Sequence, residues 1–174
     1  METNQIKFNI ILATDADSGI AKNHKIPWYY PEDLKHFNTT TTNHIIIMGR
    51  NTADELKKPL PYRQNIVITS NKSYRDGFII VHSLDEALIK AKQISINENT
   101  KIFICGGSTI YNQCLKSDML EKIYYTHINK SYGCNIFVDP ILNNPNMIYK
   151  IMKQSLIDGV ELTYYEIGLK YEML

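Results

Sequence analysis

The chemistry in this sequence is concentrated in residues 27–37, PWYYPEDLKHF, where acids lie among aromatic and apolar side chains. Pro31 suits the first turn of a helix and the two acids after it favour the positive end, so a helix start is the simplest explanation of both. It does not explain Trp28, the only tryptophan of the chain. In such a helix Asp33 and Phe37 would lie one turn apart on one face. A carboxylate beside an apolar wall is a candidate for proton chemistry, because burial raises its pKa while the helix start opposes that shift.

A pair of glycines could bind the phosphates of a ligand. In ICGGSTIY, Gly106 and Gly107 follow an apolar run and precede a helical pattern that begins with Ser108 and Thr109. Two glycines let a pyrophosphate approach the backbone, while helix amides and hydroxyls bind it. The spacing is not the GxGxxG of a dinucleotide fold. A tight turn under close packing is the alternative interpretation.

Two arginines could bind anions. MGRNT places Arg50 after a buried strand and at the start of a helix, where it would face an anion. A glycine in that position is more often only a turn. PLPYRQ places Arg63 on a proline-stiffened turn before a strand, where a fixed guanidinium can bind a carboxylate through two hydrogen bonds. A solvated surface arginine is the alternative for Arg63.

A polar stretch, DADSGIAKNHKIP, follows the first apolar run and contains few apolar residues. A loop of this length in a compact chain is often a lid over an active site. A plain surface loop explains the same pattern, and position alone does not decide between them.

Short apolar runs alternate with helical patterns, which is typical of a largely parallel sheet covered by helices. Residues 45–48 are apolar without a break, as in a strand buried on both faces. Ser83 and Glu86 form a capping box at the start of one helical pattern. The helical patterns occupy 31–39, 51–57, 84–95 and 108–117. The apolar runs are KFNIILA, HIIIMG, NIVITS, FIIVHS, KIFICG, KIYYTHI and YYEIGLKYE, and residues 139–147 are expected to form a loop.

Composition restricts the class of protein. A length of 174 residues suits one domain, 1–174, and the 19 basic and 18 acidic residues nearly cancel without a basic block, so nucleic acid is not an expected partner. The amino terminus has no long apolar run, so neither a secretory signal nor a membrane span is expected. Cys105, Cys114 and Cys134 lack metal-ligand spacing; no metal site is expected, and reduced thiols in the cytoplasm are the simplest interpretation. A monomer is the default expectation.

Several stretches, taken together and in this order, resemble dihydrofolate reductases: GIAKNHKIPWYYPEDLKHF, IIIMGRNT, PLPYRQNIVITS, ICGGSTIY and YTHI. The resemblance implies an α/β fold in a single domain, with an eight-stranded, mostly parallel twisted sheet, an antiparallel C-terminal strand and about four flanking helices. It implies NADPH-dependent reduction of 7,8-dihydrofolate to 5,6,7,8-tetrahydrofolate by hydride transfer from the nicotinamide to the pterin imine. The hydride is the cofactor's, and the protein supplies orientation and electrostatics.

The resemblance implies four residues for catalysis. Asp33 would hold the pterin ring through its amino group and a ring nitrogen, and would support protonation of the imine. Trp28 would help to fix an ordered water beside this acid. Thr126 of YTHI would hydrogen-bond the carboxylate from behind, and Tyr111 would line the hydride path.

The resemblance also assigns residues to the two ligands. The substrate set is Leu34, Phe37 and Leu56 around the rings, Arg63 at the glutamate tail, and Ile11 and Cys105 through backbone carbonyls. The cofactor set is Ala13 and Ile20 at the nicotinamide; Gly49, Arg50, Asn51, Thr52, Gly106, Gly107, Ser108, Thr109 and Ile110 at the phosphates and hydride path; and Thr69, Ser70 and Asn71 towards the adenosine ribose. Residues 15–26 become the mobile lid, with Ile26 at its tip.

Four positions depart from the family pattern. Ala21 replaces the usual glycine, which would stiffen the lid or shift its turn. Asn135 replaces a common aspartate in the loop that braces the closed lid. Ala53 replaces a frequent tryptophan, a change of packing. Asn71 stands where many members carry an arginine for the ribose 2′-phosphate, which leaves Thr69, Ser70, Lys72, Arg50 and His82 to bind that group.

Two other functions fit parts of the pattern. A reductase of riboflavin synthesis has a similar fold and uses NADPH on a pyrimidine-like substrate, but it needs neither PWYYPED nor Arg63. A folate- or nucleotide-binding module without catalysis is the other alternative, and the retention of Asp33, Trp28, Thr126 and Tyr111 argues against it. Turnover of dihydrofolate with NADPH would separate these functions.

Overall fold

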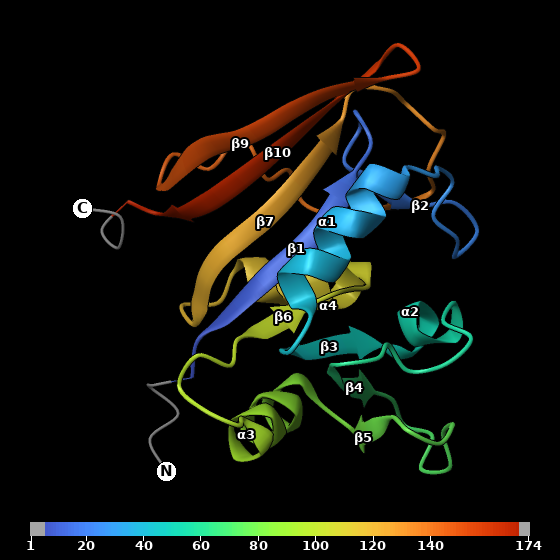
Figure 1. The fold of residues 1–174 in the computed structure, drawn as a ribbon, viewed down its shortest axis with the longest axis vertical. Coiled ribbons are helices and arrows are strands. Elements are labelled where there is room, and N and C mark those ends of the chain that lie inside the picture. Colours follow the sequence, from blue (N-terminus) through green and yellow to red (C-terminus); the bar gives the residue numbers. More distant parts are fainter. Residues whose placement is uncertain (1–5, 171–174) are drawn as a thin grey trace.

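The computed structural model describes residues 6–170, which fold around one eight-stranded sheet (Figure 1). Across the sheet the strands run in the order β5-β4-β3-β6-β1-β7-β10-β9. All pairs from β5 to β7 are parallel, whereas β10 is antiparallel to both of its neighbours. The strands are β1 Phe8–Thr14, β3 Ile45–Gly49, β4 Gln64–Ile68, β5 Ile79–Val81, β6 Ile102–Ile104, β7 Leu120–Ile128, β9 Met147–Ile157 and β10 Val160–Leu169. The expected α/β fold is confirmed.

Helices cover the sheet at the predicted places with shifted ends. They are α1 Pro31–Thr41, α2 Arg50–Asp54, α3 Leu84–Ile94 and α4 Ser108–Leu115. The prediction of 51–57 for α2 is wrong at both ends, because the chain leaves the helix after one turn. The capping box is half confirmed: Ser83 Oγ accepts from Glu86 N, but the Glu86 carboxylate accepts from His82 N rather than closing back on Ser83.

The two faces of the sheet carry separate apolar clusters. On one face α3 and α4 pack against residues such as Ile10, Ile45 and Ile47. On the other, α1 and α2 pack against residues such as Ile46 and Met48. Figure 1 shows α1 crossing this second face in front of β1. The unbroken apolar run at 45–48 is explained, because these side chains alternate between two buried faces.

Three strands were not among the predicted apolar runs. β9 is an edge strand whose side chains are exposed along most of its length, so its sequence lacks a continuous apolar signal. The predicted loop at 139–147 therefore ends as β9 begins. The other two are β2 Gly19–Ala21 and β8 Ile136–Phe137, which form a separate two-stranded sheet.

The carboxyl ends of the parallel strands carry the residues singled out by their chemistry. β1 ends at Thr14, β3 runs into Arg50, and β6 runs into the glycine pair. In open α/β sheets ligands bind at this edge. Between residues 6 and 170, no helix has the length and apolar character needed to cross a membrane.

Candidate active site

The carboxyl group of Asp33 lies at the start of α1, against β7. Thr126 Oγ1, on β7 and buried, donates a 2.8 Å hydrogen bond to Asp33 Oδ1. Burial raises the pKa of Asp33, and the hydrogen bond from Thr126 opposes that rise. The net direction is upward, so Asp33 is an acid that takes a proton more readily than an exposed aspartate. The structure brings these two predicted residues together.

A row of side chains across three strands supports this acid. Ala13 on β1 pairs with Thr126, which pairs in turn with Tyr164 on β10. Because directly opposed residues point to one face of a sheet, all three lie on the side that α1 covers. Ala13, predicted at the nicotinamide, therefore lies beside the Asp33–Thr126 pair.

His36 and Tyr164 belong to this site and were not predicted. The rings of His36 and Tyr164 pack in a T-shaped pair, with centroids 4.9 Å apart. Burial lowers the pKa of His36, while the charge of Asp33 raises it. Tyr164 is buried, and among the described residues its hydroxyl has no hydrogen-bond partner. The spacing of three from Asp33 could have indicated His36, whereas Tyr164 is brought in only by strand pairing.

Trp28, just before α1, contacts an aromatic side chain in the loop after β7. Its ring lies 5.4 Å from that of Tyr132, and Tyr132 also hydrogen-bonds the hydroxyl of Tyr30. Trp28, Ala13 and Tyr164 pack in one apolar cluster. Trp28 thus lies in the surroundings of Asp33, and its effect on a water beside that acid stays a prediction.

The residues predicted for the substrate rings surround the same face. Ile11, Phe37, Leu56 and Cys105 belong to one apolar cluster. Leu34 leaves 48% of its surface exposed, which an apolar ligand could cover. The thiol of Cys105 is expected to be unreactive, because burial raises its pKa and keeps it protonated.

The backbone carbonyl of Ile11 links this face to α4. Tyr111 Oη donates a 2.8 Å hydrogen bond to it from the opposite side of the sheet. A carbonyl oxygen has a second lone pair, so this bond leaves acceptor capacity for an amino group of a ligand. Tyr111 itself is buried, and burial raises the pKa of its hydroxyl, so it acts as a neutral donor.

Arg63 is held against the far end of α1. Nη1 donates to Asn38 Oδ1 and to Thr41 Oγ1, both at 3.0 Å, and Nε donates to Pro61 O at 3.0 Å. The guanidinium lies 5.9 Å from the Phe37 ring centroid. These four groups restrain the guanidinium, and its binding of a substrate carboxylate stays a prediction.

The glycine turn packs directly against the end of β3. Gly49 N donates to Gly106 O at 2.8 Å. Gly106 has φ +124°, and a Cβ there would lie 2.9 Å from Thr52 Oγ1. A Cβ on Gly49 would likewise lie 3.1 Å from Ile110.

The turn is closely packed, as in the alternative interpretation, but its backbone amides still suit the phosphates of a dinucleotide. Both glycines keep side chains away, and α4 begins at Ser108 with no side chain bonded to its first amides. Those amides form a positive end that favours phosphate. Thr109 is exposed in the same first turn, and Asn51 is exposed beside Thr52 on α2.

The base of the predicted lid is fixed by a buried carboxylate. Asp15 accepts hydrogen bonds from the backbone amides of Asp17, Gly19 and Tyr132, at 3.0, 2.8 and 3.0 Å. Burial raises the pKa of Asp15, but these bonds outweigh it and the pKa lies below its ordinary value. Gly19 leaves no room for a side chain, because a Cβ there would lie 2.4 Å from Cys134 Cβ.

The lid is braced at Asn23 by Asn135. Its side chain accepts from Asn23 N at 2.9 Å and donates to Asn23 Oδ1 at 3.1 Å, so the neutral replacement keeps a bracing contact. Ala21 lies in β2, and the left-handed backbone falls on Ser18, Asn23 and His24. The expected turn therefore needs no glycine at 21. Ile20 is half-buried in β2, and Ile26 at the tip remains 55% exposed.

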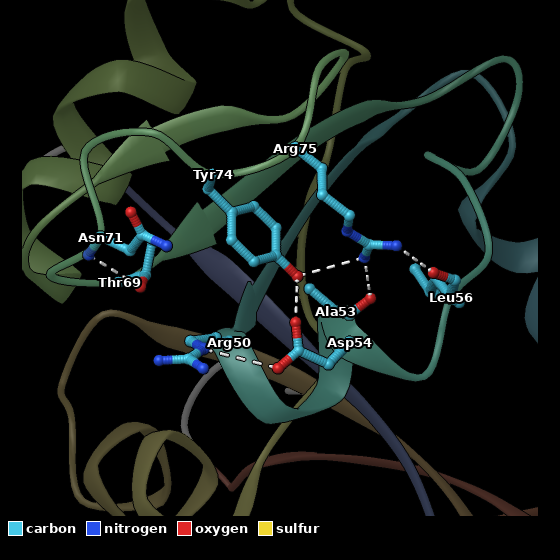
Figure 2. A network of polar contacts seen from close by, with 8 residues as sticks. All are labelled: Arg50, Ala53, Asp54, Leu56, Thr69, Asn71, Tyr74 and Arg75. Atoms are coloured by element: carbon cyan, nitrogen blue, oxygen red, sulfur yellow. Dashed lines mark hydrogen bonds and ion pairs between the residues drawn. The ribbon is translucent and has the colours of Figure 1, made fainter.

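The end of β4 carries the residues predicted for the ribose phosphate. Thr69 is buried, and its Oγ1 accepts from Asn71 N at 3.1 Å, while its carbonyl contacts His82 Nδ1 at 2.7 Å. Ser70, Asn71 and Lys72 are exposed. Figure 2 shows Thr69 and Asn71 beside a polar network that includes Arg50.

Comparison with known proteins agrees with this geometry. Residues 7–161 match the family model described as dihydrofolate reductase. The dihydrofolate reductase of Buchnera aphidicola subsp. Acyrthosiphon pisum is 42% identical over 125 residues, covering 71% of this chain and 73% of that protein. The dihydrofolate reductase of Aedes albopictus is 32% identical over 156 residues, covering 82% and 84%. The structure of dihydrofolate reductase from Enterococcus faecalis complexed with NADP(H) and RAB-propyl superimposes with a TM-score of 0.80 at 26% identity, covering 95% of this chain and 98% of that chain.

Proposed function

Because the chain belongs to the dihydrofolate reductase family, we propose that it reduces 7,8-dihydrofolate to 5,6,7,8-tetrahydrofolate with NADPH. The observation that carries this proposal is the Asp33–Thr126 pair, an acid with a raised pKa beside an apolar ring-binding face. The reaction adds a hydride to the carbon and a proton to the nitrogen of the pterin imine. Bound NADPH would supply the hydride.

The protein's own residues bind the pterin and promote its protonation. The Asp33 carboxylate can accept two N–H groups from the amidine-like edge of the pterin, which fixes the ring. A negative charge beside the ring raises the proton affinity of the imine, and a protonated imine accepts hydride more readily than a neutral one. Thr126 fixes the orientation of the carboxylate, and the carbonyl of Ile11 offers a further acceptor.

The cofactor would lie along the carboxyl ends of β1, β3 and β6. Gly49, Gly106 and Gly107, with Ser108 and the first amides of α4, would bind the phosphates, because no side chain caps the first amides of α4. Ala13 and Ile20 would contact the nicotinamide, and the lid at 15–26 would exclude water from it.

A direct assay tests this function. The purified chain is mixed with dihydrofolate and NADPH, and the loss of cofactor absorbance is followed. We expect turnover well above a no-enzyme control. Binding of both ligands without turnover would support a binding module instead.

Thr126→Val is expected to shift the pH dependence of kcat/KM to higher pH. The hydrogen bond from Thr126 lowers the pKa of Asp33 against the effect of burial, so its loss raises that pKa further. With a higher pKa, the Asp33–substrate pair keeps its proton to higher pH. The fall of kcat/KM on the alkaline side of the profile therefore moves to higher pH. The profile is measured from mildly acidic to mildly alkaline pH, and Thr126→Ser should keep the parent profile. An unmoved limb in Thr126→Val would remove Thr126 from this role.

We further propose that the enzyme works as a monomer in the cytoplasm. All three cysteines are free of disulfides, which suits a reducing compartment. Sedimentation of the purified chain tests the oligomeric state, and a stable dimer at working concentration would refute it.

A further inference from the structure

A polar network joins α2 to the loop between β4 and β5 (Figure 2). Arg50 Nε lies 3.4 Å from Asp54 Oδ2. The other carboxylate oxygen, Asp54 Oδ1, accepts a 2.6 Å hydrogen bond from Tyr74 Oη. That hydroxyl in turn accepts from Arg75 Nη2 at 3.1 Å. The loop therefore holds the Asp54 carboxylate beside Arg50.

Arg75 binds backbone carbonyls at the end of α2. Nη2 donates to Ala53 O at 2.5 Å and Nη1 donates to Leu56 O at 2.6 Å. Its guanidinium also lies over the rings of Tyr74 and Phe78, 5.2 and 4.9 Å from their centroids. A cation at carbonyls that end a helix is favourable, and these contacts use both terminal nitrogens. Arg50, whose side chain is 58% exposed, is thus the arginine of this network that can still bind a ligand phosphate.

Asp54 opposes such binding. An exposed ion pair at this spacing orients Arg50 only weakly, because solvent screens it and side-chain entropy opposes it. A phosphate in contact with the Arg50 guanidinium would lie within about 8 Å of Asp54, one Debye length at physiological ionic strength, so repulsion between the two anions persists. Because a dianion doubles this repulsion at a given distance, we expect the repulsion to exceed the small gain from orientation. Asn71 is neutral and exposed, and it offers no compensating charge.

On the basis of the proposed NADPH chemistry, we propose that Asp54 is a specificity-determining residue that weakens binding of the ribose 2′-phosphate and so narrows the preference for NADPH over NADH. The two cofactors differ only in that phosphate. Tyr74 contacts the other oxygen of the same carboxylate, so the Asp54 charge itself, and not this hydrogen bond, carries the effect. Asp54 touches no reacting atom, so its effect falls on cofactor choice.

The test is calorimetric binding to the full chain with two fragments, adenosine 2′,5′-bisphosphate and adenosine 5′-monophosphate. Asp54→Asn removes the charge but keeps an acceptor for Tyr74. We expect this variant to bind the bisphosphate about 3- to 10-fold more tightly, and the monophosphate less than about twofold more tightly, at low salt. NADP⁺ and NAD⁺ should show the same contrast, and high salt should reduce the gain.

Two variants separate charge from structure. Asp118→Asn makes the same charge change at an exposed position before β7, at the opposite edge of the sheet, and should give no selective gain. Tyr74→Phe keeps the Asp54 charge but loses the hydrogen bond, and should not reproduce the gain. Thermal melting confirms that each variant folds.

The outcomes are distinct. Equal bisphosphate affinity in the parent and Asp54→Asn, or weaker binding in the variant, would overturn the role of Asp54 while leaving the proposed function intact. The same gain in Tyr74→Phe would assign the effect to a loosened loop and would also overturn it. If the parent bound neither fragment nor NADP⁺, the proposed cofactor use would itself be refuted, and this inference with it.

Discussion

Asp33→Asn is expected to lower kcat/KM for dihydrofolate at neutral pH by about 10²- to 10⁴-fold, the usual contribution of a positioned acid or base. The amide keeps one acceptor oxygen for Thr126, but it carries no charge to raise the proton affinity of the imine. Binding of NADP⁺ should change little, because no phosphate contact is assigned to α1. Steady-state kinetics and calorimetry measure the two effects. Unchanged kcat/KM would refute the assigned role of Asp33.

The neighbouring acid provides a matched control. Glu32 Oε1 accepts hydrogen bonds from Lys153 Nζ at 2.7 Å and Ser155 Oγ at 2.5 Å, both on β9. Those contacts bind Glu32 to the sheet edge rather than to the ring-binding face. Glu32→Gln removes the same charge one residue away, and it should retain most of the parent activity.

The same two variants should change stability in opposite directions. Burial raises the pKa of Asp33, so stability is lost as the pH rises from the ordinary carboxyl value through that raised pKa. Asp33→Asn removes this penalty and should raise the free energy of unfolding at neutral pH. The hydrogen bond from Lys153 lowers the pKa of Glu32, so its charge stabilises the fold at neutral pH, and this contribution is lost as the pH falls. Glu32→Gln should therefore be less stable than the parent, as measured by denaturant titration at neutral pH.

This opposition connects stability with function. Burial makes a carboxyl group suitable for proton chemistry by raising its pKa. The same burial lowers the stability of the folded state at neutral pH, where the group is charged. Loss of activity together with gain of stability in Asp33→Asn would distinguish a poised acid from a structural ion pair. Loss of both would indicate that the Asp33–Thr126 hydrogen bond serves mainly to hold α1 on the sheet.

The central strands and the acid could be predicted because their causes are local. Residues 45–48 are buried on both faces, so they form an unbroken apolar run. Asp33 stands out because a carboxylate at a helix start has apolar neighbours one turn away. β9 could not be found in this way: it is an edge strand with Ile151 and Met152 each 53% exposed, and only its pairing with β10 defines it.

The missed parts of the site depend on contacts between distant segments. Tyr164 reaches the surroundings of Asp33 because β10 pairs with β7 in a particular register. Arg75 binds one carbonyl in the last turn of α2 and one just after it, because the β4–β5 loop folds back over a helix shorter than the sequence pattern indicated. Neither effect leaves a local periodicity. Both are set by loop conformation and strand register, which one sequence does not specify.

Arg63→Ala is expected to weaken dihydrofolate binding by about 1.5–3 kcal/mol, the range for hydrogen bonds to a charged group. This corresponds to a rise in Kd of about 10- to 150-fold. The arginine is already oriented by Asn38, Thr41 and Pro61, so little side-chain entropy remains to be lost when a carboxylate binds. Arg63→Lys keeps a charge without the planar pair of donors, and it should fall between the parent and Arg63→Ala.

The same contacts offer a competing explanation, because Arg63 also braces α1 and could support the ring-binding face indirectly. A ligand with the pterin and benzoyl rings but no glutamate tail separates the two. If Arg63 binds the tail, the parent and Arg63→Ala should bind this truncated ligand with affinities within about twofold, since all ring contacts remain. Equal losses for the full and truncated ligands would place the effect in the position of α1 and remove Arg63 from direct recognition of the substrate carboxylate.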